Sequence, residues 1–185
     1  IQYFKQAIER DKNCIIAYEN IIKCYGNQGN YKAQIKYCTL LIEQGENRVN
    51  AYIRRGIAYK NLKNYGAAKK DYLQAIALDP ENAWAYNNLG NVYRSLEEYQ
   101  SAIQYFMKAI SLDADYETAY LNIFNTWVKD MKDYKVAIKY FSKQMQVNKD
   151  KAYMYKHRAE ANKEQGRKFR AKLDYKKAVY LYEKN

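Results

Sequence analysis

A pattern that returns every 34 residues constrains the fold of this 185-residue chain more than any other feature. Successive repeat tyrosines lie 34, 34, 34 and 35 residues apart, and they are Tyr18, Tyr52, Tyr86, Tyr120 and Tyr155. Seven residues after each, the first four copies have an aromatic residue and the fifth has asparagine: Tyr25, Tyr59, Tyr93, Trp127 and Asn162. A fixed period of this length is the signature of a repeat protein, in which each unit buries its apolar face against its neighbours.

The second half of each copy combines small and large side chains at helical spacing. Alanines recur, and an aromatic residue follows each after four positions, in the pairs Ala68 and Tyr72, Ala102 and Phe106, Ala137 and Phe141, and Ala171 and Tyr175. Residues three and four apart share one face of an α-helix, so the small residues let helices approach and the rings fill the gaps. One Pro and seven Gly are too few for a turn-rich β-sandwich or barrel. The chain is therefore predicted to be all-α.

Residues 83–113 show the pattern in its most complete form, with Leu89, Gly90, Tyr93, Ala102, Phe106 and Ala109. At these spacings the chain resembles the tetratricopeptide repeat family, whose unit is a helix–turn–helix of 34 residues. The resemblance covers the whole chain. It implies an all-α, right-handed superhelical α-solenoid of antiparallel helix pairs, with a concave face lined by the first helix of each pair.

Counting by this frame makes the chain a single solenoid segment, residues 1–185, of one truncated repeat and five full repeats. The frames are 1–14 for the second helix of the truncated repeat, then 15–48, 49–82, 83–116, 117–151 and 152–185. We expect eleven helices, and we expect the chain to be part of a longer protein. The extra residue of the fourth full repeat is predicted near Met131–Asp133, in the turn between its helices, because a turn absorbs an insertion without breaking a helix ladder.

Two of the repeats carry a paired exchange of side chains. Three residues after the repeat tyrosine, the other copies have an apolar residue, but these two have Arg55 and Arg158. The facing position on the second helix is tyrosine in the apolar copies and becomes Asp71 and Asp174 in these two. We predict an ion pair between the two helices of each of these repeats, Arg55 with Asp71 and Arg158 with Asp174, with a structural role.

Members of the family that the chain resembles bind peptides or partner helices in the concave groove. The first-helix positions expected to be exposed in such a groove are rich in asparagine and cations: Asn20, Lys23, Arg54, Asn87, Asn88, Asn91, Arg94, Asn122, Asn125, Lys129, Lys156 and His157. Asparagine recurs at one frame position, in Asn20, Asn88 and Asn122, and its amide can donate to and accept from a peptide main chain. This row resembles the asparagine ladder in the tetratricopeptide region of O-GlcNAc transferase, although asparagine is also common at these positions in ordinary repeats.

The formal net charge of +12 indicates an acidic partner. Cations outnumber carboxylates on the predicted concave face, so an acidic peptide or a C-terminal carboxylate suits it. A chaperone-tail clamp fits less well, because no three successive frames reproduce the family's clamp residues. The last repeat adds a basic patch, which is either a docking site for an acidic protein, tubulin tail or nucleic acid, or a solvated outer face: Arg167, Lys168, Arg170, Lys172, Lys176 and Lys177.

The sequence offers little for catalysis or metal binding. His157 is the only histidine, and Cys14, Cys24 and Cys38 lack a CxxC spacing and are interpreted as buried small residues. The sequence has no glycine-rich loop of the kind that holds phosphate, and its carboxylates are scattered over helix surfaces. We therefore predict no catalytic residues, no metal site and no cofactor.

The leading interpretation is a non-enzymatic protein–protein interaction scaffold that binds a partner peptide or helix within a multi-subunit complex. Two alternatives stay open: a substrate-recruiting arm of a larger enzyme such as a glycosyltransferase, and a co-chaperone that binds acidic C-terminal tails. Nucleic acid is disfavoured as a partner, because the aromatic residues occupy packing positions rather than a stacking surface. No apolar run approaches the ~20 residues of a membrane span. The few, odd-numbered cysteines favour a cytoplasmic location, with a cytoskeletal or ciliary setting as one option.

Overall fold

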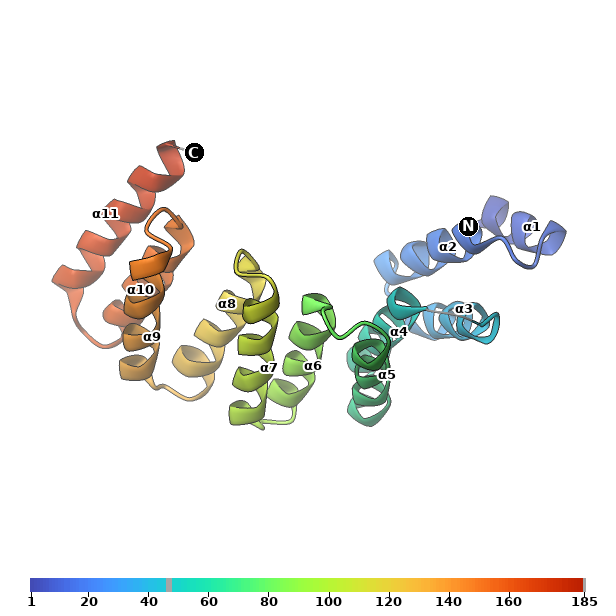
Figure 1. The fold of residues 1–185 in the computed structure, drawn as a ribbon, viewed down its shortest axis with the longest axis horizontal. Coiled ribbons are helices and arrows are strands. Elements are labelled where there is room, and N and C mark those ends of the chain that lie inside the picture. Colours follow the sequence, from blue (N-terminus) through green and yellow to red (C-terminus); the bar gives the residue numbers. More distant parts are fainter. Residues whose placement is uncertain (46–47, 185) are drawn as a thin grey trace. The chain divides into compact units, whose positions relative to one another are not determined.

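The computed structural model describes residues 1–45 and 48–184, and this part of the chain contains eleven α-helices, one π-helical segment and no strand (Figure 1). The all-α fold class is confirmed. No helix in this part is both long and apolar enough to cross a membrane. The elements are α1 (Gln2–Arg10), α2 (Ile15–Asn27), α3 (Tyr31–Glu43), α4 (Val49–Asn61), α5 (Tyr65–Leu78), α6 (Ala83–Ser95), α7 (Tyr99–Leu112), α8 (Glu117–Phe124), η1 (Asn125–Asp130), α9 (Tyr134–Val147), α10 (Ala152–Glu164) and α11 (Lys168–Lys184).

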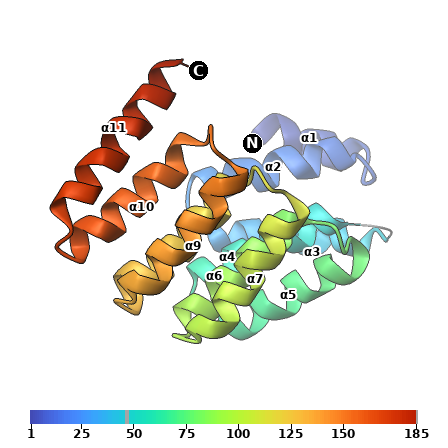
Figure 2. The same cartoon turned by 60° about the vertical axis from the view of Figure 1, so that its left-hand side comes forward.

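The chain forms two compact units, Ile1–Ala114 and Asp115–Asn185. In the first unit, α2 pairs with α3, α4 with α5 and α6 with α7, and the first helices touch in series, α2 with α4 and α4 with α6. In the second unit, α9 packs against η1 and α10, and α10 packs against α11 (Figure 2). Each antiparallel pair therefore buries its apolar face against the next pair of its unit. The division into repeat frames remains a prediction.

Small side chains face rings where the helices of a pair approach. In the pair α6 and α7, Ala85, Ala102 and Phe106 are fully buried. Gly90 is also buried, and a Cβ added there would lie only 2.6 Å from Cε1 of Phe106. The 34-residue pattern thus encodes the positions at which two helices can come this close.

The five turns inside the helix pairs share one backbone feature. The middle residue of each has a positive φ, whether or not it is glycine: Gly29, Lys63, Glu97, Lys132 and Gly166. After α4, the Asn64 N–H donates to the Tyr59 carbonyl and the Lys63 N–H donates to the Lys60 carbonyl, both at 2.9 Å. This Schellman arrangement closes the C-terminal end of the helix. The side chain of Asn64 then caps α5 by accepting from the Ala67 N–H.

The extra residue of the fourth pair lies in a helix, so the prediction of a turn insertion at Met131–Asp133 was wrong. The helices α8 and η1 are consecutive and have 8 and 6 residues, one more together than the 13 residues of α2, α4, α6 or α10. The π-helix absorbs this residue through wider bonds, such as the one from the Met131 N–H to the Thr126 carbonyl at 2.9 Å. A longer turn would lose the positive-φ geometry that all five turns share, whereas one wide helical turn keeps it.

Candidate functional site

A cleft opens between the first helices α2 and α4 of the first unit, with a volume of about 220 Å³. Three residues of the predicted groove, Asn20, Lys23 and Arg54, come together there. Three buried apolar residues and two exposed polar residues complete its lining: Ile22, Leu41, Ala51, Glu19 and Asn50. The cleft therefore presents two amides, two cations and one carboxylate beside apolar surface.

Two of the polar side chains in this cleft are held by neighbours. Asn20 donates from Nδ2 to the Ile16 carbonyl at 2.9 Å, one turn back on α2, and its amide retains a second N–H and an oxygen for another partner. The guanidinium of Arg54 lies over the ring of Trp84 on α6, 5.8 Å from the ring centroid. This cation–π contact orients Arg54 without using its capacity to bind a carboxylate.

Two of the three predicted asparagines of α6 are buried, and the expectation that they are exposed was wrong. Asn87 is 3% exposed and Asn88 is 8% exposed. Asn88 donates from Nδ2 to the Trp84 carbonyl at 2.8 Å, in the same way as Asn20 on α2. Asn91 and Arg94 are half-buried on the same helix. In a stacked array, neighbouring pairs cover part of each first helix, so a frame position alone does not determine exposure.

In the second unit, the predicted groove residues differ in exposure. Lys129 and Lys156 are exposed, whereas Asn122 and Asn125 are half-buried. Lys129 lines a cleft of about 340 Å³ that mixes both signs of charge with apolar and aromatic surface: Phe124, Val128, Lys132, Glu160, Lys163, Glu164 and Tyr175. The two glutamates offset two of the three lysines, which leaves one cation in excess, as in the cleft between α2 and α4 where Glu19 offsets one of two cations.

His157 is a packing residue, and its predicted place in an exposed groove was wrong. It is 4% exposed, and its ring stacks on Phe124 and packs against Phe141, with centroid distances of 4.9 and 5.4 Å. Burial, and after it the positive charge of Lys156, lower the pKa of His157 to about 4. The ring is therefore neutral at physiological pH, and it fills space between α8, α9 and α10.

The six residues of the predicted basic patch are all exposed, in the turn before α11 and along α11 itself. Lys168, Lys172 and Lys176 are spaced four residues apart, which places them on one side of the helix. The Nζ of Lys177 lies 4.9 Å from the centroid of the Tyr180 ring. The patch is thus a solvent-facing row of cations, available to an acidic surface.

Both predicted arginine–aspartate pairs form, and each has a third partner that the sequence interpretation missed. Arg55 donates from Nε and Nη2 to the two carboxylate oxygens of Asp71, both at 2.8 Å, and from Nη1 to the hydroxyl of Thr39 at 2.9 Å. Hydrogen bonding to Asp71 raises the pKa of Arg55 above its ordinary value. Thr39 lies on α3, so one guanidinium joins α4 to its own partner helix and to the preceding one.

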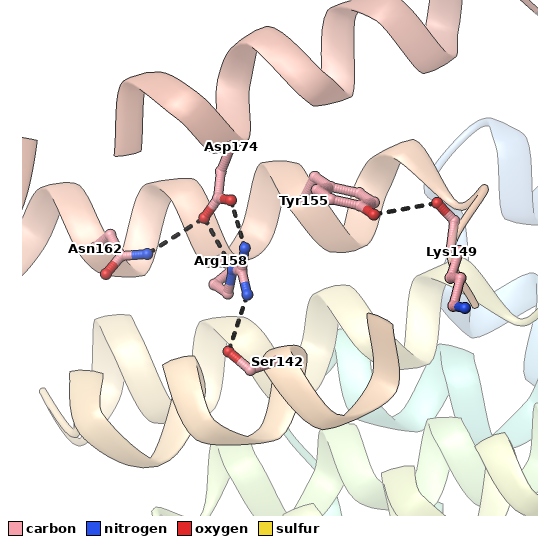
Figure 3. A network of polar contacts seen from close by, with 6 residues as sticks. All are labelled: Ser142, Lys149, Tyr155, Arg158, Asn162 and Asp174. Atoms are coloured by element: carbon pink, nitrogen blue, oxygen red, sulfur yellow. Dashed lines mark hydrogen bonds and ion pairs between the residues drawn. The ribbon is translucent and has the colours of Figure 1, made fainter. Parts of the chain in front are cut away.

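The second pair repeats this arrangement in the other unit (Figure 3). Arg158 donates to both carboxylate oxygens of Asp174, and its Nη1 donates to the hydroxyl of Ser142 on α9 at 3.1 Å. Thr39 and Ser142 lie 16 residues before their arginines, as the aspartates lie 16 residues after them. That symmetric spacing is the sequence signal that identifies the hydroxyls.

Among the described residues, burial makes one thiol unreactive, and no metal-binding group is found. The three cysteines are free thiols, and burial raises the pKa of the Cys38 thiol to about 12, which makes it a poor nucleophile. Within residues 1–45 and 48–184, no group of three or more His, Cys, Asp or Glu side chains could hold a metal ion.

Two family models match the sequence. A tetratricopeptide repeat model matches residues 83–116, and a second model, described as a TPR repeat, matches residues 56–93. A search of curated proteins finds no match.

Several solved structures are similar to this chain. A crystal structure of MamA protein has a TM-score of 0.67 at 23% identity, over 92% of this chain and 92% of that chain. YrrB, described as a TPR protein with an unusual peptide-binding site, has a TM-score of 0.63 at 20% identity, over 96% and 91%. A tetratricopeptide repeat protein from Parabacteroides merdae ATCC 43184 has a TM-score of 0.70 at 20% identity, over 97% and 71%.

At these identities the structural neighbours establish the fold, an array of antiparallel helix pairs like that of MamA. The family models add the repeat signature itself, over residues 56–116. Pattern, helix pairing and comparisons agree: residues 56–116 match tetratricopeptide repeat models, and the chain has the fold of a tetratricopeptide repeat array.

Proposed function

We propose that the chain is a non-enzymatic protein-interaction domain that binds an acidic peptide segment in the cleft between α2 and α4. The observation that carries this proposal is the meeting of Asn20, Lys23 and Arg54 around one cleft of about 220 Å³. The tetratricopeptide fold supports a protein partner. The description of YrrB, a protein of the same fold with a peptide-binding site, supports a peptide as the ligand.

A peptide has two features that these side chains suit. Its main chain offers N–H and C=O groups, and the amide of Asn20 can pair with both. Its acidic side chains suit Lys23 and Arg54, and a guanidinium binds a carboxylate through two parallel N–H···O bonds. Glu19 also lines the cleft and repels a further carboxylate. We therefore expect a segment with one or two acidic residues rather than a long acidic run.

Two alternative functions would use the same cleft. A co-chaperone would hold a free C-terminal carboxylate, so amidation of the peptide would abolish its binding. A recruiting arm of a larger enzyme, such as a glycosyltransferase, would bind internal segments as a scaffold does, and the enzyme's own domain would distinguish it. We place the domain in a multi-subunit cytoplasmic assembly, because its three free thiols suit a reducing compartment.

The test is calorimetric titration of the chain with a short acetylated and amidated peptide that has two aspartates among alanines. Arg54→Glu should weaken binding by about tenfold or more, because it replaces the carboxylate's partner with a like charge. Lys70→Glu is the matched control, since it makes the same change of charge at an exposed position of α5. Equal weakening by both variants would mean that only the overall charge attracts the peptide.

A further inference from the structure

A cleft of about 250 Å³ lies in the second unit, between the second helices α9 and α11. Its apolar walls come from Ile138 on α9 and Leu173 on α11. Its polar lining consists of the ion pair of Arg158 and Asp174 and the amide of Asn162, together with Ser142 and Arg170. This cleft is separate from the candidate peptide site, which belongs to the first unit.

The cleft lies at two repeat positions that have aromatic rings in other copies but not in the last one. In three other copies, the position equivalent to Asn162 has an aromatic ring that packs on a tyrosine of the second helix. Centroid distances are 5.6 Å for Tyr25 and Tyr37, 5.0 Å for Tyr93 and Tyr105, and 5.0 Å for Trp127 and Tyr140. In the last copy Asn162 and Asp174 replace both rings of this pair, and the smaller side chains leave space.

One residue that lines this cleft has a hydrogen-bond acceptor without a donor. Asn162 is 2% exposed and donates from Nδ2 to Asp174 at 3.3 Å, while its Oδ1 is buried and has no hydrogen-bond partner. Figure 3 shows Oδ1 directed away from Asp174. The reverse orientation of the amide would place Oδ1 against a carboxylate oxygen, which repels it. Nδ2 therefore faces Asp174, and Oδ1 is the atom without a partner. A buried carbonyl without a donor is destabilising, and a ligand that brings a donor would relieve it.

The mouth of the cleft is positively charged and partly apolar. Arg170 is exposed, and Leu173 is 53% exposed. Arg167, Lys168 and Lys172 are exposed nearby on the same turn and helix, whereas the carboxylate of Asp174 is already paired with Arg158. This charge distribution favours a ligand whose surroundings are acidic.

We propose that this cleft is a docking pocket for a tyrosine side chain within an acidic segment of a partner protein. The ring replaces the missing aromatic pair, against Ile138 and Leu173, and its hydroxyl donates to Oδ1 of Asn162. The guanidinium of Arg170 lies over the ring or pairs with an adjacent carboxylate of the segment. The space is sufficient, because a cavity of roughly 150 Å³ holds a benzene molecule.

The experiment is a titration of the whole, ¹⁵N-labelled chain with a short acetylated and amidated peptide that has a central tyrosine between aspartates. Saturable shifts of the Asn162 side-chain amide and of the α11 backbone amides are expected. A peptide with phenylalanine should bind several-fold more weakly, because it lacks the donor, and one with alanine should lose at least tenfold. Equal binding of the tyrosine and alanine peptides would overturn the proposal.

Variants of the protein complete the test. Asn162→Tyr restores the ring of the repeat and should abolish the shifts of the α11 backbone amides. Arg170→Ala changes an exposed residue, so the protein should still fold, and it should weaken binding several-fold. Tyr59→Asn is the matched control, since it removes the equivalent ring in the other arginine–aspartate repeat and should leave binding at α9 and α11 unchanged. Arg54→Glu should also leave it unchanged, which separates this pocket from the proposed peptide site. Unaltered binding in both Asn162→Tyr and Arg170→Ala would overturn the proposal.

Discussion

At the scale of single residues, the two arginines that replace apolar side chains each join three helices. Arg55 is largely buried, with its side chain 17% exposed, and Asp71 is 5% exposed by the same measure. The guanidinium has hydrogen bonds to two oxygens of one carboxylate and to a hydroxyl of the preceding helix. A largely buried guanidinium is tolerated only when its N–H groups have hydrogen-bond acceptors. The contribution of Arg55 to stability therefore depends on Asp71 and Thr39.

A double-mutant cycle on Arg55 and Asp71 measures this dependence. Asp71→Leu should lower the free energy of unfolding by about 3 kcal/mol, because it leaves a partly buried guanidinium unpaired. The double variant Arg55→Met and Asp71→Leu should lose less than that single variant, with a coupling energy of about 1–3 kcal/mol. Urea unfolding followed by circular dichroism provides the values. Thr39→Val, which removes only the third partner, should lower the free energy of unfolding by about 1 kcal/mol. If the effects of Arg55→Met and Asp71→Leu simply add in the double variant, the two side chains do not depend on each other.

His157 makes the stability of the second unit depend on pH. Its pKa in the folded chain, about 4, is below the ordinary value of 6.5, so the unfolded chain binds more protons between these values. The stabilisation from the neutral ring is complete above about pH 6.5 and is lost as the pH falls toward 4. The loss is on the order of 3 kcal/mol, at 1.36 kcal/mol for each pKa unit.

The control for this pH dependence is His157→Phe, which keeps a ring between Phe124 and Phe141 but cannot titrate. Unfolding by urea, measured from pH 7 to pH 4, should show the wild type losing stability relative to this variant. Parallel curves for the two proteins would show that His157 does not change its charge on unfolding in this range.

The outcome at individual residues shows what a repeat frame can predict. The arginine–aspartate pairs were predictable, because both members changed together at fixed frame positions. The burial of Asn87, Asn88 and His157 was not, because it depends on side chains of neighbouring helices, such as the ring of Phe124 beside His157. A frame gives the direction of a side chain on its own helix but not what covers it.

At the scale of elements, the π-helix η1 accommodates a one-residue difference in length between helix pairs. The turn after it keeps the length and the positive φ of the other turns, here at Lys132. The sequence predicted the insertion but not its position, because counting residues between two aligned positions does not distinguish a wide helical turn from a long loop. The three-residue length and the positive φ of the turn, seen in all five pairs, decide between them.

Deleting one residue from η1 tests this account of the element. Removal of the exposed Lys129 should convert the segment to an ordinary α-helix of 13 residues, with a change in unfolding free energy within about 1 kcal/mol. Removal of the exposed Ser95 from α6, which has 13 residues already, should cost more than about 2 kcal/mol, because it displaces the turn and cap that follow. Thermal and urea unfolding compare the two deletions, and equal losses would contradict the account.

At the scale of the whole molecule, the two binding surfaces that we propose are local clefts, one within each unit. The sequence predicted a groove of twelve residues, and three of them meet in one cleft of the first unit. The reason is that stacking covers some first-helix positions and leaves others open, which depends on the residues of each neighbouring pair. Part of the net charge of +12 lies in the exposed row of cations on α11, whereas the cleft at Arg54 has two cations and one carboxylate.

A charge exchange between Arg54 and its ligand tests the central claim most directly, because it requires contact and not merely attraction by the net charge. Calorimetry would compare the acidic peptide with a peptide that has lysines in place of its aspartates, each with the wild type and with Arg54→Glu. We predict that the acidic peptide binds the wild type at least about tenfold more tightly than the variant, and that the lysine peptide binds the variant more tightly than the wild type. Identical dissociation constants of the acidic peptide for both proteins would contradict the claim.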